Sequence, residues 1–366
     1  MKLAVVVPGG VDRSGEVRVV PALLALLKRL AAQHEVHVFA LRQEAEPGEW
    51  PLLGAHVHNI GGPSMALGQI KAVRAIAREH GRGRFDLVQS IWSGPAGAVA
   101  VAAAKLLGLR SAVHVAGGEL VALHDIGYGG RLGVRGRLRE GWVLRGASAL
   151  TAASRPVLDQ LVALGRTGRR LPLGVDLDAW PTRPAERREA GAPLRLVQVA
   201  SLNRVKDQTC LLQALAQVPQ VELDLIGEDT LRGEIQALAR SLGLAGRVRF
   251  HGFMTQAALR PLLAQAHLHV ITSRHEAGPL AVLEAAVLGV PSVGTAVGHL
   301  AEWAPQAALV VAPGDATGLA GLIARVAGDE DLRLQLAHEA QRRALAEDAD
   351  HCHGEFERLY AELLGR

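Results

Sequence analysis

The chain has 366 residues, of which 49% are hydrophobic, 21% charged and 3% aromatic, and its formal net charge is +4. This length predicts two domains, and this composition predicts a globular protein that buries a sizeable core. No apolar run reaches the ~20 residues that span a bilayer, and because the first one follows directly after Met1 and Lys2 we expect no signal peptide. Because Cys210 and Cys352 form no CxxC pair, we expect two buried, reduced thiols in a cytoplasmic protein.

Charge is distributed unevenly along the chain. Residues 1–193 hold 25 Lys and Arg against 16 Asp and Glu, whereas residues 194–366 hold 15 against 20. The basic first half suggests an anionic partner, such as an acidic acceptor, a lipid headgroup or a membrane surface. An Arg-rich composition with no special role explains it equally well, since 35 of the 40 basic residues are Arg.

In the first half, short apolar runs alternate with stretches of helical periodicity. The expected strands are Leu3–Val7, Val36–Ala40, His56–Ile60, Leu87–Ser90, Ala112–Val115 and Ala149–Ala152, and the expected helices are Val17–Ala31, Met65–Glu79, Pro95–Leu107 and Gly133–Arg145. This alternation predicts a parallel sheet covered on both faces. The last of these helices mixes arginines with apolar residues, which fits either docking on an anionic membrane or an ordinary Arg-rich surface helix.

Residues 178–193 interrupt the alternation with three prolines and no apolar period, which predicts a linker. Strands are then expected at Arg195–Val199, Leu223–Ile226, Val248–His251, Leu268–Ile271, Pro291–Val293 and Leu309–Val311, with helices between them and a helical tail. The sequence therefore predicts an α/β protein of two Rossmann-like, doubly wound parallel-sheet domains facing across a cleft. The expected boundaries are 1–177, 194–345 and a final helix, 346–366, that packs back toward the N-terminal domain.

Loops that follow strands hold the candidate functional residues, because ligands of open parallel sheets bind beyond the carboxyl ends of the strands. After the first strand, Gly9 and Gly10 leave backbone N–H groups for phosphate oxygens, although the loop lacks the GxGxxG spacing and any tight first turn needs glycine. After the strand Arg195–Val199, Arg204 and Lys206 are cations suited to a diphosphate. Lys206 is the only lysine after position 105, which favours a specific use.

The segment Ser273–Pro291 carries the strongest pattern, two carboxylates eight residues apart. Glu276 lies in the loop after a strand, and Glu284 lies inside the following helix, of which Pro279 is the expected first residue. The two can reach different ends of one ligand whose phosphates meet the helix N-terminus, and carboxylates suit sugar hydroxyls. The alternative is structural, with Glu276 at a helix start and Glu284 on a solvated face, but the apolar neighbours of Glu284 argue against it.

These motifs resemble the family 4 glycosyltransferases of the two-Rossmann B-type fold. The carboxylate spacing followed by EAAVLGVPSVGT, the PLGVD motif at Pro172–Asp176, the stretch Ile226–Phe253 and VGHLAEW at Val297–Trp303 carry the resemblance, which is best over residues 171–345. It implies a nucleotide diphosphate sugar as donor, retention of anomeric configuration, and no metal or other cofactor. It also implies that the first domain holds the acceptor and the second the donor.

By position, the resemblance assigns Glu276 to the donor sugar hydroxyls, Glu284 to the ribose and Lys206 to the diphosphate. The full donor-binding set that it implies is Gly9, Gly10, Arg204, Lys206, Phe253, Met254, Glu276, Gly278, Pro279, Leu280 and Glu284. The stretch Ala112–Glu119 resembles the strand end where the family carries a His beside the reaction centre. The expected catalytic residues are therefore His114 and Glu276, with Glu119 and His124 as alternatives.

Two positions depart from the family pattern. Ser201 stands where an Arg is usual, five residues before the phosphate-binding Lys, and Arg204 is the candidate to supply that charge instead. Gly298-His299 stands where a glycine pair is common, so we expect the pocket near the sugar to differ in shape from that of the family.

The sequence thus predicts a retaining glycosyltransferase with an unidentified glycan, lipid-linked or small-molecule acceptor. We expect it in the cytoplasm, with peripheral contact at the inner membrane face as an option. A sugar-nucleotide epimerase or a phosphorylase on the same fold is one alternative, and a non-catalytic nucleotide-sugar-binding module, which Ser201 favours, is another. No aromatic-studded surface points to a nucleic-acid partner.

Overall fold

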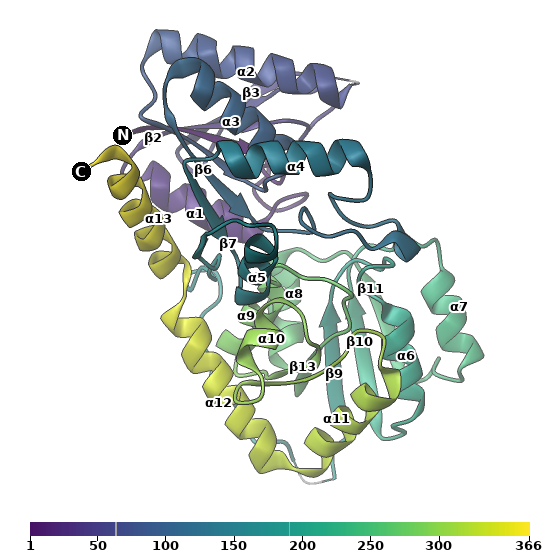
Figure 1. The fold of residues 1–366 in the computed structure, drawn as a ribbon. Helices are drawn as coiled ribbons and strands as arrows, with labels where there is room; N and C mark the ends of the chain where they lie inside the picture. The colour runs from purple at the N-terminus through teal and green to yellow at the C-terminus, as the bar shows by residue number, and fades with distance from the viewer. Residues whose placement is uncertain (63, 190) are drawn as a thin grey trace. The chain divides into compact units, whose positions relative to one another are not determined.

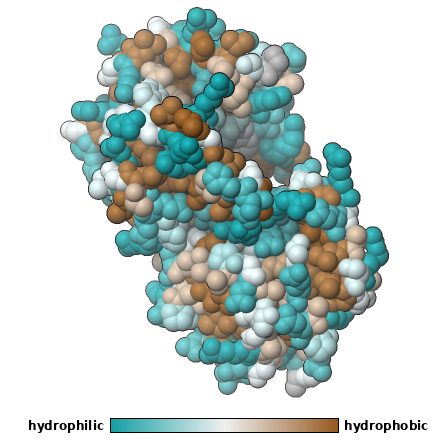
Figure 2. Space-filling model, turned by 45° about the vertical axis from the view of Figure 1, so that its right-hand side comes forward, coloured by the Kyte–Doolittle hydropathy of each residue, from teal (hydrophilic) through white to brown (hydrophobic). Residues whose placement is uncertain are grey.

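The computed structural model describes residues 1–62, 64–189 and 191–366, and these form two compact units (Figure 1). Unit 1 comprises Met1–Gly174 and Ala349–Arg366, and unit 2 comprises Val175–Asp348. Each contains a predominantly parallel sheet with helices on both faces, which confirms the predicted fold class. Every helix within the described ranges is too short or too polar to cross a membrane. Apolar and hydrophilic side chains are interspersed over the face drawn in Figure 2.

Unit 1 is built on an eight-stranded sheet in the order β3-β4-β2-β1-β5-β6-β7-β8. The strands are β1 (Lys2–Val7), β2 (Glu35–Ala40), β3 (Gly48–Leu52), β4 (Ala55–Asn59), β5 (Leu87–Ile91), β6 (Arg110–Val115), β7 (Ala149–Ala152) and β8 (Arg169–Arg170). The sequence analysis did not anticipate β3, an edge strand that pairs antiparallel with β4. Its hairpin turn places Leu53 and Gly54 at φ of 51° and 86°, and a leucine gives no turn signal at a position where Asn or Asp is usual.

Helices cover both faces of this sheet. On one face, α1 (Pro21–Ala31) and α13 (Ala349–Leu364) pack together, and on the other α2 (Met65–Arg82) packs with α3 (Pro95–Leu107). The remaining helices of the unit are η1 (His124–Ile126), α4 (Val134–Gly146) and α5 (Arg155–Ala163). Phe356 and Tyr360 of α13 are fully buried in the same core as Leu3 and Leu87, so the last helix of the chain completes the core of unit 1.

Unit 2 contains a six-stranded, wholly parallel sheet in the order β11-β10-β9-β12-β13-β14. The strands are β9 (Leu194–Val199), β10 (Val221–Ile226), β11 (Val248–Gly252), β12 (Leu268–Ile271), β13 (Ser292–Thr295) and β14 (Ala308–Val311). One face is covered by α6 (Gln208–Ala216), α7 (Glu234–Ser241) and α11 (Ala316–Gly328). The other is covered by α8 (Gln256–Ala264), α9 (Leu280–Val287), α10 (Gly298–Trp303) and α12 (Glu330–Ala346).

The segment predicted as a linker, 178–193, belongs to unit 2. Ala190 lies outside the described residues, and the other positions of this segment form neither helix nor strand. The backbone N–H of Arg188 donates to Glu330 Oε1 at 2.8 Å, and the buried guanidinium of Arg333 donates to the carbonyl of Glu186. These bonds hold the segment against the N-terminal part of α12.

Candidate functional site

Unit 2 brings the predicted residues Lys206 and Glu276 into direct contact. β9 and β12 are neighbours in the middle of the sheet, so the loops beyond their carboxyl ends lie side by side. Lys206 Nζ lies 2.5 Å from Glu276 Oε1, and Ser273 Oγ donates to the same oxygen at 2.6 Å. The N–H of Arg274 donates to the carbonyl of Val205 at 2.7 Å, which ties the two loops together. The result is a preformed pair of a cation and a carboxylate, which a ligand with an anionic group and a hydroxyl can separate.

The turn before α6 fixes the backbone of Lys206. Asp207 adopts a left-handed conformation, with φ of 48°, and its side chain accepts the N–H of Cys210 as the N-cap of the helix. Asn203 Oδ1 accepts the N–H of Lys206 at 3.0 Å. The Lys206 side chain itself is 26% exposed. The backbone is therefore held while the ammonium group can change its partner.

Glu284 lies on α9 and is only 4% exposed, so it does not belong to a solvated helix face. Burial raises the pKa of this carboxyl to about 8. Gln256 Nε2 donates to Glu284 Oε1 at 2.8 Å and holds the side chain in place. At neutral pH the group is mostly a neutral carboxylic acid, which both donates and accepts hydrogen bonds.

The start of α9 differs slightly from the prediction, because the helix begins at Leu280 and Pro279 precedes it in an extended conformation. Gly298, at the start of α10, packs directly on this turn. A Cβ at Gly298 would lie 2.7 Å from Pro279 Cδ and 3.2 Å from Glu276 Cβ, and its φ of 49° also favours glycine. The absence of a side chain at this position therefore allows α10 to pack closely against the loop that carries Glu276 and Gly278.

The other residues predicted for unit 2 have separate environments. The Arg204 guanidinium is 59% exposed and pairs with Glu234 of α7 at 3.1 Å. Phe253 is 57% exposed just beyond β11, whereas Met254 is half-buried against the core beneath α8 and α9. An exposed aromatic ring beyond a carboxyl end of the sheet is available to a planar ligand.

In unit 1, the side chain of Gln43 binds backbone N–H groups of the glycine loop after β1. Gln43 Oε1 accepts the N–H groups of both Gly10 and Val11, at 2.7 and 3.0 Å. Gly10 has φ of 83°, and a Cβ at this position would lie 2.7 Å from Val20. Gly9 also abuts Gln43. The N–H group of Gly10, which the sequence analysis expected to be free for phosphate, is thus bound within the protein, together with that of the next residue in the loop.

His114 lies within β6 and is only 1% exposed. Its Nδ1 is 2.9 Å from Thr151 Oγ1, its ring meets Phe356 of α13 edge-on, and its Nε2 has no hydrogen-bond partner among the described residues. Burial lowers the pKa of His114 to about 3, so the imidazole is neutral. The ring therefore lies beneath α13 and not in a loop beyond the strand. Its role beside a reaction centre stays a prediction.

A buried pair of carboxyl groups lies at the same end of this sheet. Ser93 donates through its N–H to Glu119 Oε1 and through its Oγ to Glu140 Oε2, both at 3.0 Å. Burial raises the pKa of Glu119, and burial together with the nearby Glu119 raises the pKa of Glu140 to about 7. The sequence analysis named Glu119 only as an alternative and did not identify Ser93 or Glu140. Ser93 directly follows β5, so the rule that loops after strands carry function could have found it.

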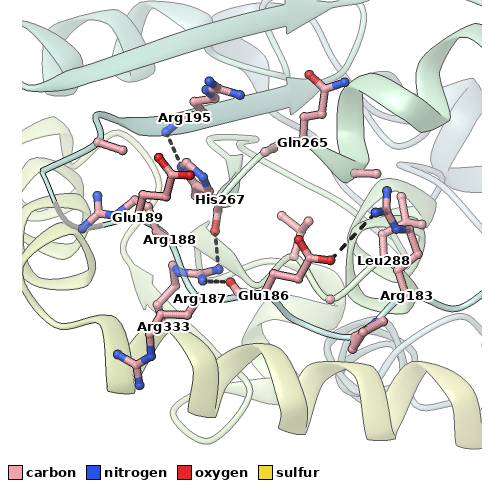
Figure 3. A pocket seen from close by; sticks show the side chains of 16 residues that line it. Arg183, Glu186, Arg187, Arg188, Glu189, Arg195, Gln265, His267, Leu288 and Arg333 are labelled. Carbon is pink, nitrogen blue, oxygen red and sulfur yellow. Dashed lines mark hydrogen bonds and ion pairs between the residues drawn. The ribbon is translucent and has the colours of Figure 1, made fainter.

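Unit 2 also contains a pocket of about 370 Å³ that is rich in arginine, at the amino-terminal ends of β9 and β12 (Figure 3). Its labelled lining residues are Arg183, Glu186, Arg187, Arg188, Glu189, Arg195, Gln265, His267, Leu288 and Arg333. Arg333 donates to the carbonyls of His267 and Glu186, and Arg188 donates to that of Ala327 at the end of α11. Arg183 and Arg187 pair with Glu186 and Asp331, so four of these arginines already have partners within the protein.

Two family descriptions match the chain. Residues 182–343 match "Glycosyl transferases group 1", and residues 19–174 match "Glycosyl transferase 4-like domain". The lipopolysaccharide core biosynthesis glycosyltransferase LpsE of Rhizobium meliloti is 37% identical over 130 residues, which cover 35% of this chain and 37% of that protein. Glycogen synthase of Mycobacterium tuberculosis is 29% identical over 221 residues, 58% of this chain and 53% of that protein. The matched region thus spans from about a third to about half of the length of these relatives.

Solved structures share the fold over the whole chain. Sucrose-phosphate synthase of Thermosynechococcus elongatus has a TM-score of 0.85 at 20% identity, with full coverage of both chains. Anabaena HepE in complex with UDP-glucose has a TM-score of 0.73 at 21% identity and covers 99% of this chain and 100% of its own. At these identities the likeness concerns the fold.

Proposed function

Because this chain belongs to the family 4 glycosyltransferases, we propose that it transfers a sugar from a nucleotide diphosphate sugar to a hydroxyl-bearing acceptor, with retention of configuration and without a metal ion. The observation that carries the proposal is the Lys206–Glu276 pair at adjacent carboxyl ends of the unit 2 sheet. HepE, which shares the fold, is solved with UDP-glucose bound, and this supports a nucleotide-sugar donor.

In the proposed reaction, the diphosphate of the donor displaces Glu276 from Lys206. The ammonium group then neutralises the charge that develops on the leaving nucleoside diphosphate, and the N–H groups at the start of α9 add a fixed positive dipole. Glu276, once released, accepts a hydrogen bond from a hydroxyl of the donor sugar, and Glu284 meets the ribose. The acceptor hydroxyl bonds to the anomeric carbon, from the face that the leaving group vacates, as the bond from that carbon to the diphosphate breaks. The proton of the hydroxyl passes to the leaving diphosphate, and no nucleophile from the protein is required.

We also propose that the enzyme acts in the cytoplasm and contacts anionic membranes through α4. On this helix Val134, Leu138 and Trp142 are 61%, 66% and 38% exposed, among several arginines. Apolar and cationic side chains together suit an anionic lipid surface. Sedimentation with phosphatidylglycerol vesicles tests this point, because Leu138→Glu should then lower binding, and equal binding to phosphatidylcholine vesicles would contradict it.

The donor is tested by thermal unfolding with UDP, GDP, ADP and their sugar conjugates, in EDTA and then in Mg²⁺. A ligand at a hundredfold excess over its Kd stabilises the folded state by about 2.7 kcal/mol. We expect one nucleoside diphosphate class to raise the unfolding temperature in EDTA. Lys206→Ala should lose this shift, whereas Glu276→Gln should keep or enlarge it, because it removes the group that competes for Lys206, and should lose turnover. If no nucleotide shifts the unfolding temperature, the proposed donor site is wrong.

A further inference from the structure

Unit 1 contains a pocket of about 350 Å³ between α2 and the hairpin of β3 and β4 (Figure 1). Its lining includes Lys71, Arg74 and Arg78 of α2 on one side and Glu49 and His58 of the hairpin on the other. In the strand order β3-β4-β2-β1 this hairpin forms the edge of the sheet, and β2 separates it from β1 and the glycine loop. Pockets of this size hold small ligands.

The three cations of α2 share one face of the helix, because they are three and four residues apart. Lys71 and Arg74 make no hydrogen bond or ion pair with the residues that the structure describes. The guanidinium of Arg78 lies 3.9 Å from Glu79, which Arg82 already binds at 2.7 Å. Like charges at this spacing repel one another and destabilise a helix. An anion bound among them would relieve that repulsion.

A chain of hydrogen bonds engages the carboxylate of this pocket. Glu49 is the only acidic side chain among the described residues that line the pocket, and its Oε1 lies 3.0 Å from His58 Nδ1. His58 Nε2 lies 2.9 Å from His37 Nδ1. His37 Nε2 in turn lies 3.0 Å from Glu35 Oε1. Two imidazoles thus connect the carboxylate of the pocket to a second carboxylate on β2.

The protons of this chain determine its charge. The hydrogen bond from His58 lowers the pKa of Glu49, and both carboxylates are ionised because hydrogen bonds from Lys2 and His37 also lower the pKa of Glu35. Three hydrogen bonds among these four groups then require three protons on the four ring nitrogens, so the imidazole pair carries one positive charge. That charge balances Glu49 and leaves the cations of α2 without a carboxylate partner in the pocket.

The charge that remains favours an anion with several oxygens. A guanidinium group binds two oxygens of a phosphate in parallel, and an ammonium group binds one as a point charge. A phosphate monoester carries nearly two negative charges and three acceptor oxygens at neutral pH, which suits two guanidinium groups and one ammonium group. A carboxylate offers one charge and two oxygens, and a neutral sugar offers no charge.

We propose that this pocket binds the phosphate group of a phosphorylated molecule, with Lys71, Arg74 and Arg78 in direct contact. His58 is a positioning residue, because it engages the carboxylate of Glu49 that would otherwise pair with these cations. The site goes beyond the proposed function, since neither the donor-binding residues of unit 2 nor the glycine loop of β1 line the pocket.

The test is a phosphorus-31 NMR titration of the full chain carrying Lys206→Ala, with inorganic phosphate and glucose 6-phosphate as probes. Lys206→Ala removes the cation of unit 2 that could bind phosphate, so the result does not depend on the proposed donor site. We expect saturable binding of at least one probe at physiological ionic strength, which equal concentrations of glucose or acetate do not displace.

Variants of the cations locate the site. Lys71→Ala and Arg74→Ala should each raise the Kd at least about fivefold, because each removes a charged hydrogen-bond donor. Arg84 is the matched control, since it is exposed and unpaired among the described residues, follows α2 directly and lies outside the pocket. Arg84→Ala changes the net charge equally and should leave the Kd within about twofold.

Variants of the hairpin test the positioning role. Glu49→Gln removes the negative charge of the pocket and keeps an oxygen for His58, so it should lower the Kd at least about threefold. A gain of affinity cannot come from misfolding. His58→Phe releases Glu49 toward the cations and should raise the Kd, and the double variant His58→Phe/Glu49→Gln should restore it.

Sedimentation with phosphatidic acid vesicles distinguishes two sources of the phosphate group. Vesicle binding that glucose 6-phosphate displaces and that Lys71→Ala loses would identify a lipid headgroup. Binding of the soluble probes alone would identify a small phosphorylated molecule.

The inference is overturned if neither phosphate probe binds, or if Arg84→Ala weakens binding as much as Lys71→Ala does. It is also overturned if Glu49→Gln leaves the Kd unchanged or raises it, because Glu49 would then not face the bound anion.

Discussion

The two sheets place carboxyl groups beyond their strands in contrasting settings. In unit 2, Glu276 is half of an ion pair with Lys206 at 2.5 Å. In unit 1, Glu119 and Glu140 both accept hydrogen bonds from Ser93, and the guanidinium of Arg139 lies 3.9 Å from Glu140. Burial outweighs Arg139 and raises the pKa of Glu140 to about 7. A carboxylate held by a cation can exchange that cation for an anionic ligand, whereas a buried carboxyl that retains its proton is suited to neutral hydroxyl groups.

The largest expected effect is a difference in kcat between variants of Lys206 and of Arg204, the other cation of the same loop. Lys206→Ala should lower kcat for nucleoside diphosphate release by about 10²–10³-fold, because it removes the charge that stabilises the leaving group. Arg204→Ala should cost less than threefold, since that guanidinium is exposed and pairs with Glu234. Steady-state release of the diphosphate measures both variants. Equal losses would show that the position of the cation in the loop is immaterial.

The proton held by unit 1 should appear in the pH dependence of stability. The pKa of Glu140 is about 7 in the folded state against an ordinary value of 4.5 for an exposed glutamate, so folding takes up a proton between these two pH values. The contribution of Glu140 to the free energy of unfolding is greatest below pH 4.5 and is lost as the pH rises through 7. The total change is about 3 kcal/mol. Urea unfolding of the protein and of Glu140→Gln at pH 5 and pH 8 measures this difference.

Histidines such as His114, whose pKa falls to about 3, change stability in the opposite direction at acid pH. They are common to both proteins, so they cancel in the comparison. If the protein and Glu140→Gln lose stability in parallel between pH 5 and pH 8, Glu140 is not the proton carrier.

The smallest expected effect is a difference in the free energy of unfolding between variants of Ser93 and Ser273, which each donate to a carboxyl group. Ser93→Ala removes the donor to Glu140 and should lower the free energy of unfolding by about 1 kcal/mol at pH 7. Ser273→Ala removes the matching donor to Glu276 but leaves Lys206 in place, so its cost should be smaller. Urea unfolding distinguishes the two. A larger loss for Ser273→Ala would reverse the assignment of which carboxyl depends on its serine.

The sequence predicted what depends on local pattern. The alternation of strands and helices gave the two sheets, and the rule of loops after strands placed Lys206 and Glu276, which the structure brings together. It could not show that Gln43 satisfies the N–H groups of the glycine loop, because that contact joins residues 32 and 33 positions apart. Glu140 was hidden for a similar reason: it lies on an Arg-rich helix, and only tertiary packing buries it.

The edge strand β3 and the placement of 178–193 illustrate the same limit. Leu53 adopts a turn conformation that its residue type does not favour, and the proline-rich segment packs through arginines whose partners lie more than 130 residues away. Local propensity therefore predicts neither the turn at Leu53 nor the packing of residues 178–193.

The position of α13 has a consequence for synthesis on the ribosome. Unit 2 is one continuous stretch, Val175–Asp348, and can fold as soon as it has emerged. Unit 1 begins the chain but needs Phe356 and Tyr360 to fill its core. Its first 174 residues must therefore wait, with that part of the core uncovered, until residues 349–366 have been made, so unit 1 begins before unit 2 and is completed after it.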